Sequence, residues 1–238
     1  MAIAVFSDIH GNLEALQAVL KDCKKRRIKK KNIFFLGDAI SMGINSRECI
    51  TLIEQSGINV CMGNHEQRMI AHDRGVTKWS ANGRLHFQNT LMSLTNENLN
   101  FIKRMPIFHK IYYKNYRLLF THYQHGYDGN VMDDYVDFSE ATCEEMFGKE
   151  NCNVVFFGHV HHRNLLITGK GRGYVCVGSS GLVQTDTTFY TLFDIKDDNY
   201  DIKRICIKYN RKKFEEKWHN EQHYIKTMFA DHFGIEKD

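Results

Sequence analysis

Five short segments of this chain place side chains that can bind a metal ion directly after an apolar run. The segments are Asp8-Ile9-His10, Gly37-Asp38, Gly63-Asn64-His65-Glu66, Thr121-His122 and Gly158-His159-Val160-His161. In open α/β sheets, ligands and catalytic groups gather at the carboxyl ends of the strands. We therefore expect seven side chains to converge at such an edge: Asp8, His10, Asp38, Asn64, His122, His159 and His161.

The first third of the chain alternates apolar runs with amphipathic ones. Residues 3–6, 33–36 and 58–62 are predicted to be strands. A helical pattern follows the first strand, with Asn12 as its cap, and a second helical pattern covers residues 48–54. Strands and helices that alternate at this spacing indicate parallel strands joined by right-handed crossovers.

A different pattern begins after a helical stretch of about residues 80–105, which the chain's single proline, Pro106, closes. Apart from a helix expected at 141–147, the chain then consists of short apolar runs separated by turns such as Asp197-Asp198-Asn199. These runs lie at residues 107–113, 117–121, 154–157, 165–168, 174–177, 190–195 and 202–207. The second half is therefore predicted to be mainly antiparallel, and two packed sheets are the economical arrangement.

The last part of the chain is charged and helical in pattern. One apolar stripe runs along it, made of Phe214, Trp218, Tyr224, Met228 and Phe229. We expect residues 1–208 to form one domain and residues 209–238 to be a C-terminal helical extension that packs on that domain.

Length and charge narrow the class of protein. A chain of 238 residues suits one globular domain, and its 32 basic and 28 acidic side chains are too balanced to indicate a nucleic-acid binder. A basic run covers residues 21–31, and we interpret it as the solvated end of a helix, where cations are favoured, rather than as a nucleic-acid patch.

The cysteines and the apolar segments indicate the cellular compartment of the protein. Seven cysteines without a C-x-x-C pair are typical of reduced thiols. The N-terminal apolar run is too short for a signal peptide, and no stretch approaches the roughly 20 apolar residues of a membrane span. We expect a cytoplasmic protein without a membrane partner.

The donor atoms of the seven side chains predict a particular kind of metal site. Carboxylate, amide and imidazole donors without a thiolate suit one or two divalent metals such as Mn, Fe, Co, Ni or Zn. Two such ions carry four positive charges and the carboxylates of Asp8 and Asp38 return two, so an anionic phosphate would be attracted. His65 is not needed as a ligand, and beside the site it could protonate a leaving oxygen.

The five segments together resemble the calcineurin-like metallophosphoesterases, whose pattern is D-x-H, GD, GNH[DE], H and GHxH. The segments from Ser7 to Asn12 and from Gly63 to Glu66 are similar to the compact bacterial and archaeal phosphodiesterase-like subgroup. The resemblance continues through Leu94-Thr95-Asn96-Glu97-Asn98-Leu99 and Gly178-Ser179-Ser180-Gly181, and so covers about residues 1–208. It implies an α/β (α+β) fold, a four-layer α/β/β/α sandwich of two mixed sheets flanked by helices.

The resemblance also implies a role for each residue. One metal ion would be held by Asp8, His10, Asp38 and His161, and the second by Asn64, His122, His159 and the shared Asp38. Manganese is favoured, with iron, nickel, cobalt and zinc as alternatives. His65 matches the histidine that assists the leaving group, and with Asn64 and Asp38 it makes up the expected catalytic set.

Two departures from the family pattern bear on the branch of the superfamily and on the choice of one ligand. Protein phosphatases of the superfamily carry an arginine soon after GD, whereas here Asp38 is followed by Ala39-Ile40-Ser41-Met42-Gly43. That difference argues against the serine/threonine phosphatase branch. Either His122 or His125 could match the family's single histidine, and we favour His122 because it directly follows a predicted strand.

The expected activity is hydrolysis of a phosphate ester, a diester in first place, by attack of a hydroxide held between two metal ions. The alternative within catalysis is a phosphomonoesterase, including a nucleotide or dinucleoside polyphosphate hydrolase. The alternative from another class is a non-catalytic interaction scaffold with the same fold. We expect a small phosphate ester as the partner rather than nucleic acid, and a monomer or homodimer.

Overall fold

The N-terminal third of the chain supplies the centre of the first of two five-stranded sheets. In the computed structural model, which describes residues 2–75, 80–126, 137–196, 199–220 and 225–236, strands β1 (Ala2–Phe6), β2 (Ile33–Phe35) and β3 (Asn59–Val60) pair in parallel. Strand β9 (Thr187–Lys196) pairs antiparallel with β1, and β10 (Asn199–Lys208) pairs with β9, so the order is β10-β9-β1-β2-β3.

The second sheet has the order β4-β5-β6-β8-β7. Its strands are β4 (Phe108–Tyr113), β5 (Tyr116–Thr121), β6 (Val154–Phe157), β7 (Asn164–Ile167) and β8 (Gly173–Cys176). The two edge strands pair antiparallel with their neighbours, but β5, β6 and β8 are parallel to one another. The expectation of a mainly antiparallel second half was therefore wrong for the centre of this sheet, because α6 (Glu140–Phe147) joins β5 and β6 in a crossover.

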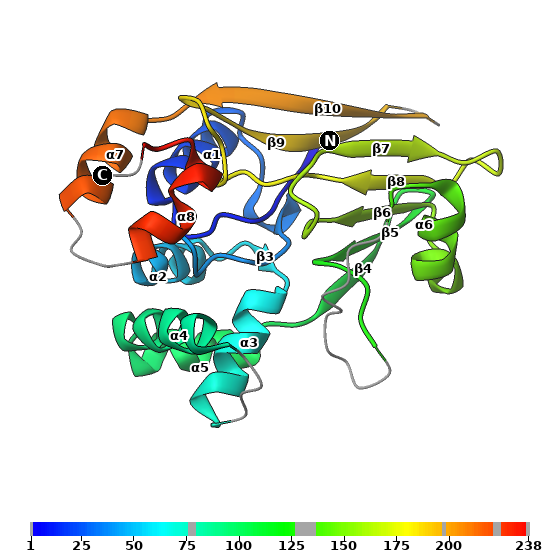
Figure 1. Ribbon diagram of the computed structural model, residues 1–238. Helices are drawn as coiled ribbons and strands as arrows, with labels where there is room; N and C mark the ends of the chain where they lie inside the picture. The colour runs from blue at the N-terminus through cyan, green and yellow to red at the C-terminus, as the bar shows by residue number, and fades with distance from the viewer. Residues whose placement is uncertain (1, 76–79, 127–136, 197–198, 221–224, 237–238) are drawn as a thin grey trace.

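The two sheets pack face to face, with helices on both outer faces (Figure 1). Between the sheets, the rings of Phe34 and Phe120 stack with their centroids 3.8 Å apart, and Phe156 contacts Phe193 edge to face. On the outside, α6 covers the second sheet through Cys143 and other buried side chains. This arrangement confirms the four-layer sandwich of two mixed sheets.

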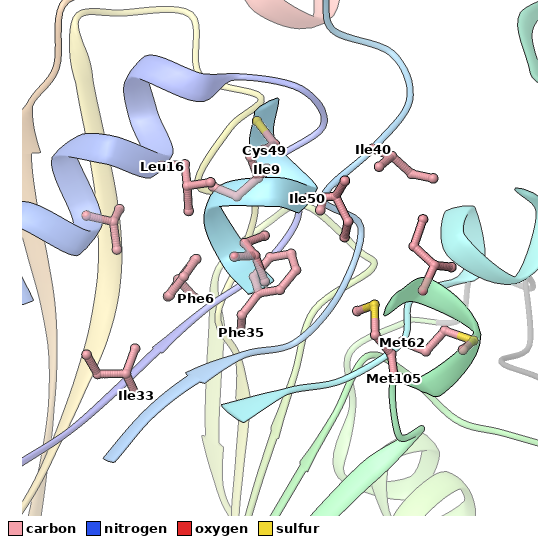
Figure 2. Close-up of a cluster of buried hydrophobic side chains, with 14 of the residues drawn as sticks. Phe6, Ile9, Leu16, Ile33, Phe35, Ile40, Cys49, Ile50, Met62 and Met105 are labelled. Atoms are coloured by element: carbon pink, nitrogen blue, oxygen red, sulfur yellow. The ribbon is translucent and has the colours of Figure 1, made fainter. Parts of the chain in front are cut away.

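The outer face of the first sheet is covered by α1 (Leu13–Lys25), α2 (Ser46–Ser56) and parts of later helices. Figure 2 shows the resulting core, in which Phe6 and Phe35 from the sheet lie close to Leu16 of α1 and Ile50 of α2. Asn12 caps α1 as expected, because its side-chain oxygen accepts a hydrogen bond from the amide of Ala15. The basic run begins on the last turns of α1, which agrees with a solvated helix end.

Two helices replace the single helical stretch expected between the third strand and Pro106. Helix α4 (Ala81–Ser93) ends before Thr95, which caps α5 (Asn96–Arg104). Thr95 Oγ1 accepts from the amide of Asn98, and Asn98 Oδ1 accepts from the amide of Thr95, so this capping box starts a new helix. Helix α3 (Asn64–Asp73) was not predicted. Short 3-10 helices also lie at Lys30–Asn32 and Gly148–Glu150.

The C-terminal helices pack against the body of the protein. Helices α7 (Arg211–Asn220) and α8 (Ile225–Phe233) bury Phe214, Trp218 and Phe233 in one cluster with Met42. The guanidinium of Arg211 donates to four backbone carbonyls, those of Val183 and Thr185 and two at the end of α8.

Tyr224 of the expected stripe and the turn residues Asp197 and Asp198 lie outside the described residues. Within the described ranges, no helix has the length and apolarity that a bilayer crossing requires.

The stack of Phe34 on Phe120 provides a test of the contact between the sheets. Phe34 is 2% exposed, and Phe34→Ala should lower the free energy of unfolding by about 4 kcal/mol, since a large cavity would remain. Chemical denaturation followed by circular dichroism measures this. The control is Tyr112→Ala on β4, where the side chain is 78% exposed and the change should stay below about 0.5 kcal/mol.

Candidate metal centre

The ends of five strands bring the predicted ligands together at one edge of the sandwich. Asp8 and His10 follow β1, Asp38 follows β2, and Asn64 is the first residue of α3, just beyond β3. His122 follows β5 in the second sheet, and His159 and His161 follow β6. All these strands except β3 are buried along most of their length, so the site rests on the rigid centre of both sheets.

Strained backbone is concentrated in this cluster. Five of the candidate ligands have a positive φ, between 45° and 66°, which side-chain-bearing residues rarely adopt: Asp8, His10, Asp38, His159 and His161. Such conformations cost about 1–3 kcal/mol each and persist only where the surroundings impose them. They turn the chain sharply at each strand end and aim the side chains inward.

Close backbone packing holds these turns in place. The carbonyl of Asp8 accepts from the Ser179 hydroxyl at 2.7 Å and from the amide of Gly181 at 3.0 Å. A Cβ atom at Gly63 would lie 2.1 Å from Asp38 Oδ1, and one at Gly158 would lie 2.6 Å from Asp8 Oδ2. Glycine is therefore required at both positions, because these carboxylates, and at Gly158 also the Ser7 hydroxyl at 2.1 Å, occupy the space that a side chain would need.

One half of the cluster is formed by Asp8, His10 and His161. His161 Nε2 lies 3.4 Å from Asp8 Oδ1 and 3.2 Å from His10 Nε2. His10 Nδ1 lies 3.3 Å from the carbonyl oxygen of Ile40, which leaves Nε2 directed into the cluster. Three potential ligand atoms of these residues lie within 4.8 Å of one another.

The other half is formed by Asn64, His122 and His159. Asn64 Oδ1 lies 2.9 Å from His122 Nε2 and 3.2 Å from His159 Nδ1. His122 Nδ1 lies 3.0 Å from the carbonyl oxygen of Leu36, which again directs Nε2 toward the centre. Asp38 stands between the halves, since its Oδ2 is 3.3 Å from His122 Nε2 and 3.7 Å from His10 Nε2.

The donor atoms of these residues and their spacing suit metal ions. Asp8 Oδ1 is buried, and its neighbours in the described structure are the ring nitrogens of His161 at 3.4 Å and His10 at 3.8 Å, both longer than an ordinary hydrogen bond. The ring nitrogens of His10 and His161 face each other across 3.2 Å, an arrangement that a shared cation would satisfy. Oxygen and imidazole donors of this kind are the ligands that divalent first-row metals take.

His65 lies beside the cluster and close to solvent. Its amide donates to Asp38 Oδ1 at 2.9 Å, and its ring Nε2 lies 4.0 Å from Asp38 Oδ2. The His65 side chain is 15% exposed and that of His161 is 32% exposed, whereas those of Asp8, His10 and Asp38 are almost fully buried. The cluster therefore opens to solvent on the side of His65 and His161.

Burial and neighbouring charges shift the pKa values of the residues in the cluster in different directions. Burial raises the pKa of Asp38, but the attraction of the neighbouring imidazoles, that of His122 first, outweighs burial and brings that pKa well below its usual range. Burial lowers the pKa of His122, and the attraction of Asp38 outweighs it and raises the pKa to about 9. Burial dominates at His10 and lowers its pKa to about 4, and it also lowers the pKa of His159. Neutral imidazole, the form that binds metal, is thus favoured at His10 and His159.

Glu66 has a structural role that the sequence interpretation missed. This fully buried carboxylate accepts hydrogen bonds from the amides of Asp38, Ala39 and Gly63 at 2.8–2.9 Å. It thereby ties the start of α3 to the turn that carries Asp38. Burial and the repulsion of Asp38 raise the pKa of Glu66 to about 7. The position of Glu66, three residues after Gly63 at the cap of α3, is the capping-box signal that could have revealed it.

His125 lies outside the cluster. Its ring stacks on that of Phe108 with centroids 5.4 Å apart, and it belongs to none of the groups of potential ligands in the described part of the chain. His122 occupies the central position instead.

Comparison with known sequences identifies the family of this protein. The profile of the calcineurin-like phosphoesterase family matches residues 1–163. The chain is 30% identical over 234 residues to an uncharacterized protein of Methanocaldococcus jannaschii, and the match covers 90% of each chain. This chain therefore belongs to the calcineurin-like phosphoesterase family.

Solved structures share the architecture. A hypothetical protein of Pyrococcus horikoshii superimposes with a TM-score of 0.76 at 17% identity, and a metallophosphoesterase of Sphaerobacter thermophilus with 0.69 at 20%; each comparison covers 99% of both chains.

A local sequence match also links this chain to the symmetrical bis(5'-nucleosyl)-tetraphosphatase of Actinobacillus succinogenes, at 30% identity over 80 residues. That match covers 33% of this chain and 29% of the relative.

The hydrogen bonds of Glu66 can be tested by truncation. Glu66→Ala would leave three buried amides without an acceptor, and we expect the free energy of unfolding to fall by about 3 kcal/mol or more. Urea denaturation in the presence of a chelator measures this without a contribution from bound metal. Glu145→Ala on α6, where the side chain is exposed, is the control. Equal stabilities of the two variants would contradict the role of Glu66.

Proposed function

We propose that this protein is a dinuclear metal-dependent phosphoesterase that hydrolyses a phosphate ester, with a diester as the favoured substrate. The observation that carries the proposal is the convergence of two buried carboxylates, one amide and four imidazoles in one cluster, in which Asp38 stands between the two halves. Membership of a phosphoesterase family supports the same chemistry.

The chain's own residues would hold two ions. Asp8, His10 and His161 would bind one ion, Asn64, His122 and His159 would bind the other, and Asp38 would be shared. Such ions, when bound, lower the pKa of water to supply a nucleophile and offset the charge of a phosphoryl group. Manganese is the favoured metal, with iron, nickel, cobalt or zinc as alternatives.

His65 is placed to handle the proton of the leaving group. Its side chain stands on the solvent side of the cluster, where a substrate would enter, and the bond from its amide to Asp38 fixes the start of the helix that carries it. Burial lowers the pKa of this ring well below its usual range in the free protein, and the negative charge of a bound phosphate would raise it again, so that Nε2 could hold a proton and pass it to the departing oxygen. Asn64 and Asp38 would complete the catalytic set by orienting the groups around the phosphate.

A hydrolase of dinucleoside polyphosphates or of phosphomonoesters is the second candidate. The local match to a bis(5'-nucleosyl)-tetraphosphatase favours it, although the match covers 33% of this chain. Parallel rates on bis-p-nitrophenyl phosphate, p-nitrophenyl phosphate and a dinucleoside polyphosphate distinguish the candidates. We expect a small phosphate ester rather than nucleic acid as the partner, because the net charge of +4 is modest for a nucleic-acid binder.

Metal removal tests the proposal directly. After treatment with a strong chelator and dialysis, hydrolysis of bis-p-nitrophenyl phosphate should fall to background, and added Mn²⁺ should restore it. Metal analysis of the same samples should show about two ions per chain in the active form. Full activity in the stripped protein would refute the proposal.

His65→Ala separates catalysis from metal binding. We expect the variant to keep both metal ions and to lose about 10²–10⁴-fold in turnover on substrates with poor leaving groups. The loss should be smaller for p-nitrophenolate, which departs without a proton. Because the ring of His65 also lies near His10 and Asp38, a variant that loses metal would instead identify His65 as a ligand.

A further inference from the structure

The loop that follows β2 carries the backbone atoms that orient His10. The amide of His10 donates to the carbonyl of Asp38 at 3.0 Å, and the amide of Gly11 donates to that of Ala39 at 2.9 Å. The ring Nδ1 of His10 lies 3.3 Å from the carbonyl oxygen of Ile40. A hydrogen bond at one ring nitrogen determines which way the other nitrogen points, so the position of this loop sets the orientation of His10.

The same loop is strained beyond Asp38. Ser41 and Met42 have φ values of 76° and 64°, and both are buried. Non-glycine residues keep such a conformation only when contacts around them impose it. The contacts on the outer side of the loop, away from the metal centre, are therefore needed to hold His10 in place.

One of these contacts comes from α4. The hydroxyl of Ser41 and Nε2 of His86 share a hydrogen bond of 2.5 Å, and the amide of Ser41 donates to the hydroxyl of Ser46. His86 is 5% exposed, so water competes little for this bond. The neighbouring Phe87 lies 6.1 Å from the ring of His65, which places this part of α4 beside the metal centre.

The other contacts come from α8, near the C-terminus. The ring of Phe229 lies 4.9 Å from that of His86, and Met42 is buried in the same cluster as Phe233. A Cβ atom at Gly43 would lie 3.2 Å from the ring of Phe233 and 2.2 Å from the carbonyl oxygen of His10. The loop is thus packed between α8 on one side and the backbone of His10 on the other.

We propose that His86 is a positioning residue for the metal centre, and that α8 supports the same centre by packing on His86 and on the loop after β2. His86 acts through Ser41 on the loop that orients His10, and Phe229 holds the ring of His86 in place. The inference rests on the proposed metal-binding function, and it assigns to the C-terminal extension a purpose beyond covering the core.

Mn²⁺ binding by isothermal titration calorimetry tests the role of His86. His86→Ala and Ser41→Ala should each weaken Mn²⁺ binding about tenfold, the lower end of the effect of residues that orient metal ligands. Because both substitutions remove the same bond, the double variant should bind no more weakly than either single one. His86→Gln, whose amide can bond to Ser41, should recover most of the affinity. Losses that add in the double variant would overturn the proposal.

Phe229→Ala tests the link to α8. It should weaken Mn²⁺ binding several-fold in the wild-type background and have no further effect in His86→Ala, since Phe229 acts through that ring. Met92→Ala on α4, at a side chain that is 77% exposed, is the matched control and should leave the affinity unchanged. All titrations are made where circular dichroism shows each variant to be folded, and Ser41→Ala serves if His86→Ala is unstable.

The outcomes separate this inference from the proposed function. If the wild type binds none of Mn²⁺, Fe²⁺, Co²⁺, Ni²⁺ and Zn²⁺, the metal-binding function and the inference both fail. If the wild type binds Mn²⁺ and the variants of Ser41, His86 and Phe229 bind it equally well, the inference alone is refuted.

Discussion

The burial of two carboxylates, Asp8 and Asp38, in one cluster is the constraint on which the rest of the structure depends. A buried charge is unfavourable unless opposite charge and hydrogen-bond donors surround it. Here the amides of His65 and His159 donate to these carboxylates, and the imidazole of His122 lies 3.3 Å from Asp38. Asp8 Oδ1 has only the longer 3.4 Å contact with His161 Nε2, and cations would complete the compensation.

This compensation requires backbone geometry that an ordinary turn does not supply. Each candidate ligand on a positive-φ residue needs neighbours that hold it there, and the structure provides them from distant parts of the chain. Ser179 and Gly181 hold the carbonyl of Asp8, Glu66 holds the turn at Asp38, and His86 bonds to the loop beyond it. Strain at the site is thus balanced by contacts made with both sheets and with the helices around them.

The exposed side of the cluster directs the chemistry. His65, His159 and His161 are the partly exposed histidines of this region, so a ligand approaching from solvent would meet their rings first. The rigid centre of the sandwich lies behind them, and α4 and α8 lie beside the loop that orients His10. A ligand set built on strand ends and braced from outside is suited to keep its geometry while a substrate binds.

The amino-acid sequence was enough to predict two packed sheets and the segments that meet in the cluster. Apolar runs that end in Asp8, Asp38 or His159 predict buried strands with polar residues at their carboxyl ends, and parallel strands must bring those ends to one edge. Local signals were less reliable where two patterns competed. The capping box at Thr95 divides a continuous helical pattern, and the crossover through α6 makes the centre of the second sheet parallel.

Three-dimensional contacts place His122 in the cluster and His125 outside it, a difference that two histidines three residues apart in sequence do not show. The hydrogen bonds of His122 to Leu36 and Asn64 join segments more than fifty residues distant in sequence. The same is true of Glu66 beneath Asp38 and of Phe229 against His86, whose roles depend on which distant side chain packs beside them. Periodicity along a chain predicts which face of an element is buried, but the partner that covers that face is chosen by three-dimensional packing.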